Sequence, residues 1–323
     1  MVSIDVGNSS SVVKNRNHIH NEGLNAILEG IAYSKDYSLI QELYLSYCSL
    51  TPEGMTRFKH LQNSGVQMKL QVLDLSNNDI GSEAPSHIRH LIPNLISLNL
   101  SHTKLGKKGT IDLALFLKEA TTNNNNVAIM RSLDLSHNNI STTGFLKIVS
   151  RLKKSTALLH LNVSHNDFSQ GQEKFATLQK FLYRTDSCRT LLMGGCKIKD
   201  SGMSFIGQGM ADNRSLTKLS LCENENISRE GLTYLMKGLL EADESKLIEL
   251  DLAKCNFNSQ KIQPLIMLLG INHKIRNINL KGNSITDEGG IELLGSVNAN
   301  EFITKINLDL NPFRHGIIKD IEA

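Results

Sequence analysis

Apolar and polar positions alternate over residues 133–140, and this short stretch is the unit from which the rest of the chain is built. Leu133 and Leu135 are separated and followed by polar residues, which predicts a short strand with one apolar face. Asn138 follows where the chain must turn, and its amide can satisfy backbone groups that the turn leaves unpaired. Residues 141–152 begin with Ser and Thr and continue with an apolar stripe, so a helix is predicted after the turn.

The same pattern recurs along nearly the whole chain. Each copy has two apolar strand positions, a turn residue that is Asn, Cys or Thr, and an apolar residue that returns to the core. A single copy cannot bury both of its apolar sides, whereas stacked copies bury them continuously, so the spacing predicts a repeat solenoid of the α/β class. The ten turn residues, 25 to 35 residues apart, are Cys48, Asn78, Thr103, Asn138, Asn166, Cys196, Asn224, Cys255, Asn283 and Asn311.

Three repeats depart from the regular length. The repeat from Asn78 to Thr103 is short and contains Pro85 and Pro93, which leaves little room for a helix. The next repeat is long, and we expect a polar loop at residues 121–126. Residues 224–227 carry one residue more than the motif, which predicts a bulged turn.

The repeat register also predicts the domain organisation. We expect residues 1–35 to form a degenerate N-terminal capping repeat, whose only strand-like residues are Val12 and Val13. Residues 36–313 hold the ten repeats, and residues 314–323 could form one short covering helix. The whole chain is expected to be a single continuous domain.

The period, the Asn or Cys at the turn, and the G-x-x-x-L pattern in the helices together resemble the ribonuclease-inhibitor-type class of leucine-rich repeats. The helix openings at residues 198–202, 227–231 and 285–289 fit that class well. The resemblance covers nearly the whole chain. It implies a horseshoe-shaped leucine-rich-repeat solenoid with parallel strands on the concave side, helices on the convex side, and a cytosolic location.

The second half also resembles the repeat domain of the actin-regulatory CARMIL family. The residues that carry this likeness are the longer turn at 221–227, the acidic segment 241–245 and the strand at 250–253. That family has a membrane-binding domain and a capping-protein-binding tail that have no match in this sequence, so its actin activity is not carried over. The RanGAP family shares the repeat class, but no local signature assigns a GTPase-activating asparagine.

Composition limits the classes of partner and the cellular location that are expected for the chain. The net charge is +3 and aromatic residues make up 5% of the chain, so no nucleic-acid partner is expected. No apolar run is nearly long enough to span a membrane, and residues 1–5 lack the charged start and the long apolar middle of a signal peptide. Five cysteines cannot all pair, and three of them occupy turn positions, which is typical of a reduced, cytoplasmic protein. No cofactor is expected.

The candidate binding residues lie at polar strand positions on the predicted concave face, where the serines of these strands are expected to be exposed as well. His102, His137 and His165 share one motif position in successive repeats, so their imidazoles should form a ladder. Stacked side chains do not converge as tetrahedral metal ligands must, so a pH-sensitive contact is favoured over a metal site. The alternative is that Ser-His-Asn is a solvated form of the turn. The predicted partner-binding residues are Tyr44, Tyr47, Asp74, His102, Asp134, His137, His165, Glu223 and Lys254.

These observations predict a monomeric, non-enzymatic scaffold that binds a folded protein on its concave face. Cys222 and His165 would lie about two strands apart with no third group, so they do not suggest a catalytic pair. Three alternatives remain open: a CARMIL-like actin-regulatory module, a regulator of a small GTPase, and a bacterial effector that acts on host proteins in the host cytosol.

Overall fold

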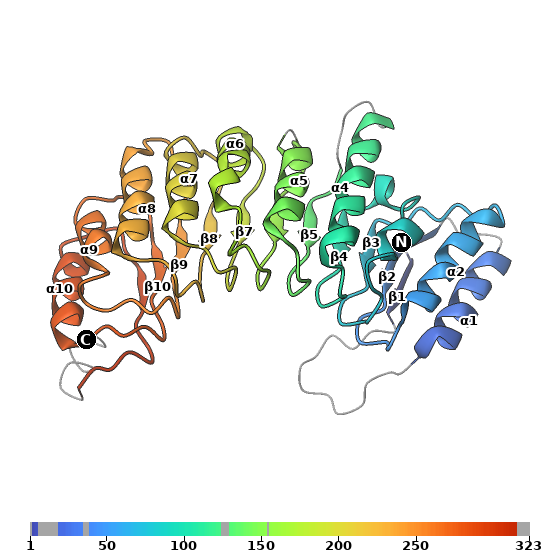
Figure 1. Cartoon of the computed structure of the whole chain (residues 1–323), viewed down its shortest axis with the longest axis horizontal. Coiled ribbons are helices and arrows are strands. Elements are labelled where there is room, and N and C mark those ends of the chain that lie inside the picture. The colour runs from blue at the N-terminus through green and yellow to red at the C-terminus, as the bar shows by residue number, and fades with distance from the viewer. Residues whose placement is uncertain (1, 6–18, 35–38, 124–128, 154, 315–323) are drawn as a thin grey trace. The chain divides into compact units, whose positions relative to one another are not determined.

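The computed structural model describes residues 2–5, 19–34, 39–123, 129–153 and 155–314. The chain divides into two compact units, Met1–Asn166 (unit 1) and Asp167–Ala323 (unit 2). In both units strands alternate with helices along the chain, and every strand pairs in parallel with the next strand of the same unit. The helices lie on one side of the strands, which we call the helix side, and the opposite surface is the strand side (Figure 1). The predicted α/β leucine-rich-repeat solenoid is confirmed.

The described residues of unit 1 contain six parallel strands, and the register joins equivalent positions of successive repeats, such as Leu43 with Leu73 and Leu98 with Leu133. Its elements are β1 (Val2–Asp5), α1 (His20–Tyr33), β2 (Ile40–Tyr44), α2 (Pro52–Asn63), β3 (Val72–Asp74), α3 (Ala84–His87), the 3-10 helix η2 (Ile92–Asn94), β4 (Ser97–Asn99), α4 (Gly106–Asn123), β5 (Ser132–Asp134), α5 (Thr142–Leu152) and β6 (His160–Asn162).

From residue 167 to residue 314, unit 2 contains five parallel strands in the same kind of register, with Leu219 beside Leu191 and Leu250 beside Leu219. Its elements are the 3-10 helix η3 (Gln172–Lys174), α6 (Ala176–Arg184), β7 (Thr190–Leu192), α7 (Asp200–Ala211), β8 (Lys218–Ser220), α8 (Arg229–Glu241), β9 (Glu249–Asp251), α9 (Gln263–Leu269), β10 (Asn277–Asn279), α10 (Asp287–Asn298) and β11 (Lys305–Asn307).

Most of the expected departures from regular repeat length are present. The short repeat has only α3 and η2 on its helix side, because its two prolines and its length exclude a full helix. The expected polar loop at 121–126 is wrong for its first part, since α4 continues to Asn123. Residues 225 and 226 form the extra turn predicted after β8.

The N-terminal segment contains a strand that the sequence reasoning missed. Residues 2–5 form β1, which pairs with β2, and α1 follows. Val12, Val13 and the predicted covering helix beyond residue 314 lie outside the described residues. The assignment of residues 1–35 and 314–323 as caps of one continuous domain stays a prediction.

The turn asparagines connect neighbouring repeats through their buried amides. Asn138 is fully buried, and its Oδ1 accepts hydrogen bonds from the backbone N–H groups of Thr103 and Leu105, both at 3.0 Å. Its Nδ2 donates to the carbonyls of Leu100, Leu135 and Ser136, at 2.5, 3.2 and 3.1 Å. One side chain therefore satisfies backbone groups of two repeats, because an amide is both donor and acceptor. Equivalent contacts are made by Asn78, Asn166, Asn224, Asn283 and Asn311.

Cysteine at the turn makes a weaker form of this contact. Cys255 Sγ donates to the carbonyl of Leu221 in the preceding repeat, at 3.3 Å. A thiol is a weak acceptor, and two N–H groups of these turns donate to backbone oxygens instead. Ile227 N–H donates to Asn224 O at 3.2 Å, which the extra residue in that turn allows, and Phe168 N–H donates to Cys196 O at 3.1 Å.

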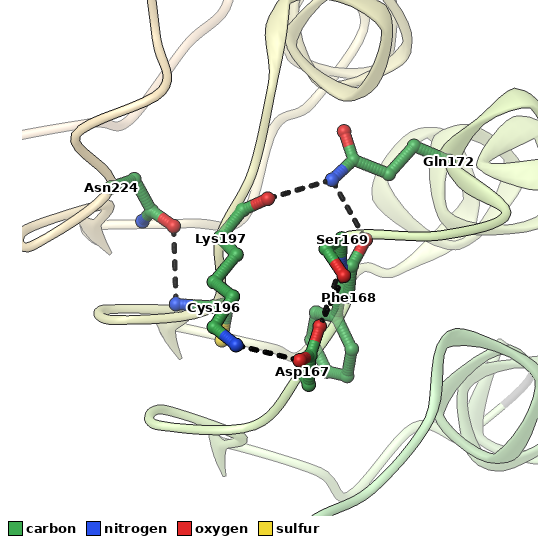
Figure 2. A network of polar contacts seen from close by, with 7 residues as sticks. All are labelled: Asp167, Phe168, Ser169, Gln172, Cys196, Lys197 and Asn224. Atoms are coloured by element: carbon green, nitrogen blue, oxygen red, sulfur yellow. Dashed lines mark hydrogen bonds and ion pairs between the residues drawn. The ribbon is translucent and has the colours of Figure 1, made fainter.

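A side-chain network reinforces the contact between the Asp167 and Cys196 turns (Figure 2). Gln172 is buried, and its Nε2 donates to the carbonyls of Phe168 at 2.8 Å and Lys197 at 3.0 Å. Asp167 accepts from Ser169 and pairs with Lys197 Nζ at 2.6 Å. These contacts lower the pKa of Asp167 to about 2, with the Lys197 hydrogen bond as the largest cause.

We predict that Asn138→Ala destabilises unit 1 by about 4 kcal/mol, because it leaves buried N–H and C=O groups of two repeats without partners. Urea unfolding followed by circular dichroism measures the loss. The control is Asn63→Ala, which removes an exposed asparagine at the end of α2 and should change stability little. Equal effects of the two variants would contradict the bridging role of the buried amide.

We predict that Asp167→Asn reduces the acid sensitivity of unit 2. The folded-state pKa of Asp167 is lowered from 3.8 to about 2. The contribution of Asp167 to the stability of the fold is therefore complete above about pH 4 and is lost as the pH falls towards 2. Urea midpoints of the wild type should therefore fall more than those of Asp167→Asn between about pH 4 and pH 2. Asp212→Asn, at an exposed position after α7, should behave like the wild type. If both variants reduced the fall equally, the ion pair would not be its source.

Candidate protein-binding surface

The first residues beyond strands β2 to β6 of unit 1 include one left-handed residue per repeat, and these residues form a column along the strand side. Their φ angles lie between +54° and +56°, a region that side chains other than glycine and asparagine seldom adopt. The sequence pattern predicts these positions on the strands, and that prediction is wrong. We call this set the turn column, and its members are Tyr47, Asn77, His102, His137 and His165.

Backbone hydrogen bonds between repeats hold the turn column in register. The N–H groups of the first four members donate to the carbonyl of the serine in the next repeat, for example His102 to Ser136 at 3.0 Å and His137 to Ser164 at 2.9 Å. The parallel ladder thus continues past the ends of the strands. Equivalent side chains are therefore spaced like neighbouring strands, about 4.8 Å apart.

The three histidines stack face to face as the repeat register predicts. The ring centroids of His102 and His137 are 3.8 Å apart, and those of His137 and His165 are 4.0 Å apart. The interplanar angles are 15° and 18°. His102 and His137 are exposed and His165 is half-buried, so one side of the stack faces solvent. Within the described part of the chain, no group of three or more His, Cys, Asp or Glu residues has metal-site geometry.

The carboxylates of Asp74 and Asp134 lie on the strands beside the turn column, and each also serves its own turn. Oδ1 of Asp74 accepts from Ser76 N–H at 2.9 Å, and Oδ1 of Asp134 accepts from Ser136 N–H at 2.9 Å. Oδ2 of Asp134 accepts from Asn162 Nδ2 at 2.9 Å. Both residues are half-buried. These carboxylates therefore stabilise the turns by accepting backbone N–H groups.

The same turns overturn one expectation about exposure. Asp74, Asn99 and Asp134 each accept from the N–H two residues later, so the chain turns inward directly after these strands. Four of the serines that were expected on the exposed face are buried, with 4–8% of their surface accessible: Ser46, Ser76, Ser101 and Ser136.

The two predicted tyrosines differ in their surroundings. Tyr44 lies on β2 between Asp5 and Asp74 of the adjacent strands, and its hydroxyl donates to Glu42 at 3.5 Å. Burial, followed by the Glu42 carboxylate, raises the pKa of Tyr44. Tyr47 belongs to the turn column and is 39% exposed, so it is the more accessible aromatic side chain.

Unit 2 has the same left-handed turn positions but different side chains. Glu223 and Lys254 occupy these positions in consecutive repeats and form an ion pair of 2.9 Å. The other three positions are Gly195, Gly282 and Leu310. The predicted residues Glu223 and Lys254 are thus brought together, but as a charge pair on unit 2. Cys222 beside them is half-buried, and burial raises the pKa of its thiol, which disfavours a reactive thiolate.

Asn77 is a member of the turn column that the sequence reasoning did not select. The available signal was its motif position, which is the one that His102 occupies in the next repeat. A residue-type search for titratable or aromatic groups overlooks it. The partner-binding role of all these residues stays a prediction.

Comparisons with known proteins agree with the repeat assignment. The family model described as "Leucine Rich repeat" matches residues 66–84, 129–149 and 272–294. The chain is 29% identical over 198 residues to NACHT, LRR and PYD domains-containing protein 4E of Mus musculus, covering 61% of this chain and 19% of that protein. It is 27% identical over 273 residues to the human protein 13 of the same name, covering 76% of this chain and 25% of that protein.

Ribonuclease inhibitor of Sus scrofa is 26% identical over 237 residues, which cover 71% of this chain and 50% of the inhibitor. The chain therefore spans about a fifth to a quarter of the NACHT-containing relatives and half of the inhibitor. No helix within the described ranges is long and apolar enough to cross a membrane. The likeness of the second half to the CARMIL repeat domain stays a prediction. By its repeat motif, its alternating parallel strands and helices, and its relatives, the chain is a leucine-rich-repeat protein of the ribonuclease-inhibitor type.

Proposed function

We propose that the chain is a non-enzymatic protein-binding module that holds a folded partner on its strand side, with the turn column of unit 1 as the main contact. The observation that carries the proposal is the stack of three imidazoles in line with Asn77 and Tyr47. Leucine-rich-repeat proteins generally mediate protein–protein interactions, which supports a binding role over a catalytic one. A cytoplasmic location and a monomeric state are part of this proposal.

The physical properties of the turn column suit recognition of a protein surface. Its backbone is held by hydrogen bonds between repeats, so little conformational entropy remains to be lost on binding. Tyr and His present flat apolar faces together with polar edges, and aromatic residues with a polar handle are enriched at interface hot spots. The stacked imidazoles supply hydrogen-bond donors and acceptors at regular spacing along one line.

The histidines also make the contact depend on pH. Imidazoles gain charge over the range just below neutrality, and neighbouring imidazoles oppose one another's protonation. A partner with an acidic surface should bind more tightly as the stack becomes charged, and a basic partner more weakly.

We predict that replacing His102, His137 and His165 together with Asn abolishes the pH response of partner binding while the fold is kept. Asn is the side chain that best tolerates the left-handed backbone of these positions, so stability should change little. A partner is first captured from lysate on the immobilised chain. Its dissociation constant is then measured for both proteins at about pH 7.5 and pH 5.5, on either side of the ordinary imidazole range.

The matched control is His60→Asn, an exposed histidine on α2 at the helix side. It should leave both the affinity and its pH dependence as in the wild type. A triple variant with unchanged affinity at both pH values would refute the role of the turn column. A triple variant that unfolds would show that the imidazoles are structural. If the captured partner is a GTPase, acceleration of its GTP hydrolysis by the chain would contradict the non-enzymatic reading.

A further inference from the structure

The short repeat leaves a gap in the helix layer of unit 1. The neighbouring helices α2 and α4 contain 12 and 18 residues, whereas α3 and η2 between them contain only four and three. Helices in a packed layer lie about 8–10 Å apart, so a repeat without a full helix leaves space between its two neighbours. A cavity of about 470 Å³ occupies this space and is lined by residues from α2, the α3–η2 segment and α4. We call it the helix-gap pocket.

The pocket gathers hydrogen-bond donors from different elements. Lys59 and Gln62 are one helical turn apart on α2, and Ser86, Arg89 and His90 belong to the segment between α2 and α4. The exposed Lys59 has no ion-pair partner among the residues that the structure describes. Burial lowers the pKa of His90, so this imidazole is neutral near pH 7 and still offers one N–H.

Arg89 is held in place by α4. Its guanidinium lies over the ring of Phe116, 5.0 Å from the centroid. Its Nε and Nη2 both contact one carboxylate oxygen of Glu119, at 2.9 and 2.8 Å. Nη1 has no hydrogen-bond partner within the described parts of the chain. The charges of Glu119 and Arg89 cancel. The lining therefore has a net positive charge, which comes from Lys59.

The remaining lining supplies a flat apolar wall. Phe116 is nearly buried beneath Arg89, and Pro93 lies in η2. The cavity falls within the range of about 300–1,000 Å³ that is usual for small-molecule sites. A single phosphate or carboxylate would fill only part of it. The ligand should therefore combine a compact anion with a flat or apolar group.

We propose that the helix-gap pocket binds a phosphomonoester carried on a flat apolar group. The five donors Lys59, Gln62, Ser86, Arg89 and His90 suit the three acceptor oxygens and the double charge of a phosphate better than the two oxygens of a carboxylate. The apolar group would lie against Pro93 and Phe116. The phosphomonoester could belong to a free small molecule or to a phosphorylated tyrosine of another protein, and both present the same chemistry.

Titration of the ¹⁵N-labelled full chain with phenyl phosphate tests the proposal, with benzoate as the carboxylate comparison. We expect saturable amide shifts confined to residues around 59–62, 86–93 and 116–119, with a dissociation constant of about 1 mM for so small a ligand. Benzoate should bind about tenfold more weakly, because it has fewer acceptor oxygens and half the charge. Linear shifts without saturation, or shifts located elsewhere, would overturn the proposal.

Two substitutions test the chemistry of the lining. Lys59→Gln should weaken phenyl phosphate binding about fivefold or more, while Arg57→Gln removes the same charge from the same helix and should have little effect. Glu119→Gln should strengthen binding, because it removes the only carboxylate in the lining and frees donors of Arg89. Equal effects of Lys59→Gln and Arg57→Gln would mean non-specific attraction and would refute the site.

A phosphotyrosine peptide distinguishes the two sources of the ligand. If it shifts the same amides and binds more tightly than phenyl phosphate, the pocket recognises a phosphorylated side chain of a partner. If both bind equally, the pocket recognises the phosphomonoester of a small molecule. Binding of neither would overturn the proposal, and it would leave the turn column on the strand side unaffected.

Discussion

Satisfaction of the backbone at the end of each strand is the constraint on which the rest of this structure depends. Where the chain leaves a parallel ladder, its N–H and C=O groups lie between two repeats and out of reach of water. A buried asparagine such as Asn138 accepts from one repeat and donates to carbonyls of both. This contact keeps the repeats in register, and the Leu pairs of the strands are buried as a consequence.

The positions of the surface side chains follow from that constraint. To bring the asparagine inward, the chain must turn within a few residues, and the residue before the asparagine takes a left-handed conformation. The backbone cost of this conformation is offset by the hydrogen bonds that the turn completes. The side chains of that residue are aligned from repeat to repeat, and in unit 1 they include the stacked imidazoles. The alignment of these surface side chains therefore results from the hydrogen bonds that satisfy the buried turn.

Departures from the regular repeat show how the same constraint is met by other means. Cys255 donates a thiol hydrogen bond to the preceding repeat, and the adjacent turn includes an extra residue that lets Ile227 bond within its own repeat. Around Cys196 the buried amide of Gln172 adds bridging hydrogen bonds. In the short repeat the strand and the turn are kept although the full helix is lost. The parallel ladder depends on the hydrogen bonds of the turn, whereas the packing of the helix layer does not depend on them. The loss leaves the helix-gap pocket, where polar and apolar groups from three elements meet.

The sequence alone determined the repeat register, the location of one strand in each of the ten regular repeats and the stacking of His102, His137 and His165, because all three follow from a period that is visible in the residues. It also located the short repeat through Pro85 and Pro93. Only the tertiary structure decided the left-handed turn, the burial of the serines and the strand at residues 2–5, since these depend on hydrogen bonds between repeats. The helix-gap pocket likewise could not be predicted, because Lys59, Arg89 and Phe116 are far apart in sequence and meet only where a helix is missing between two others.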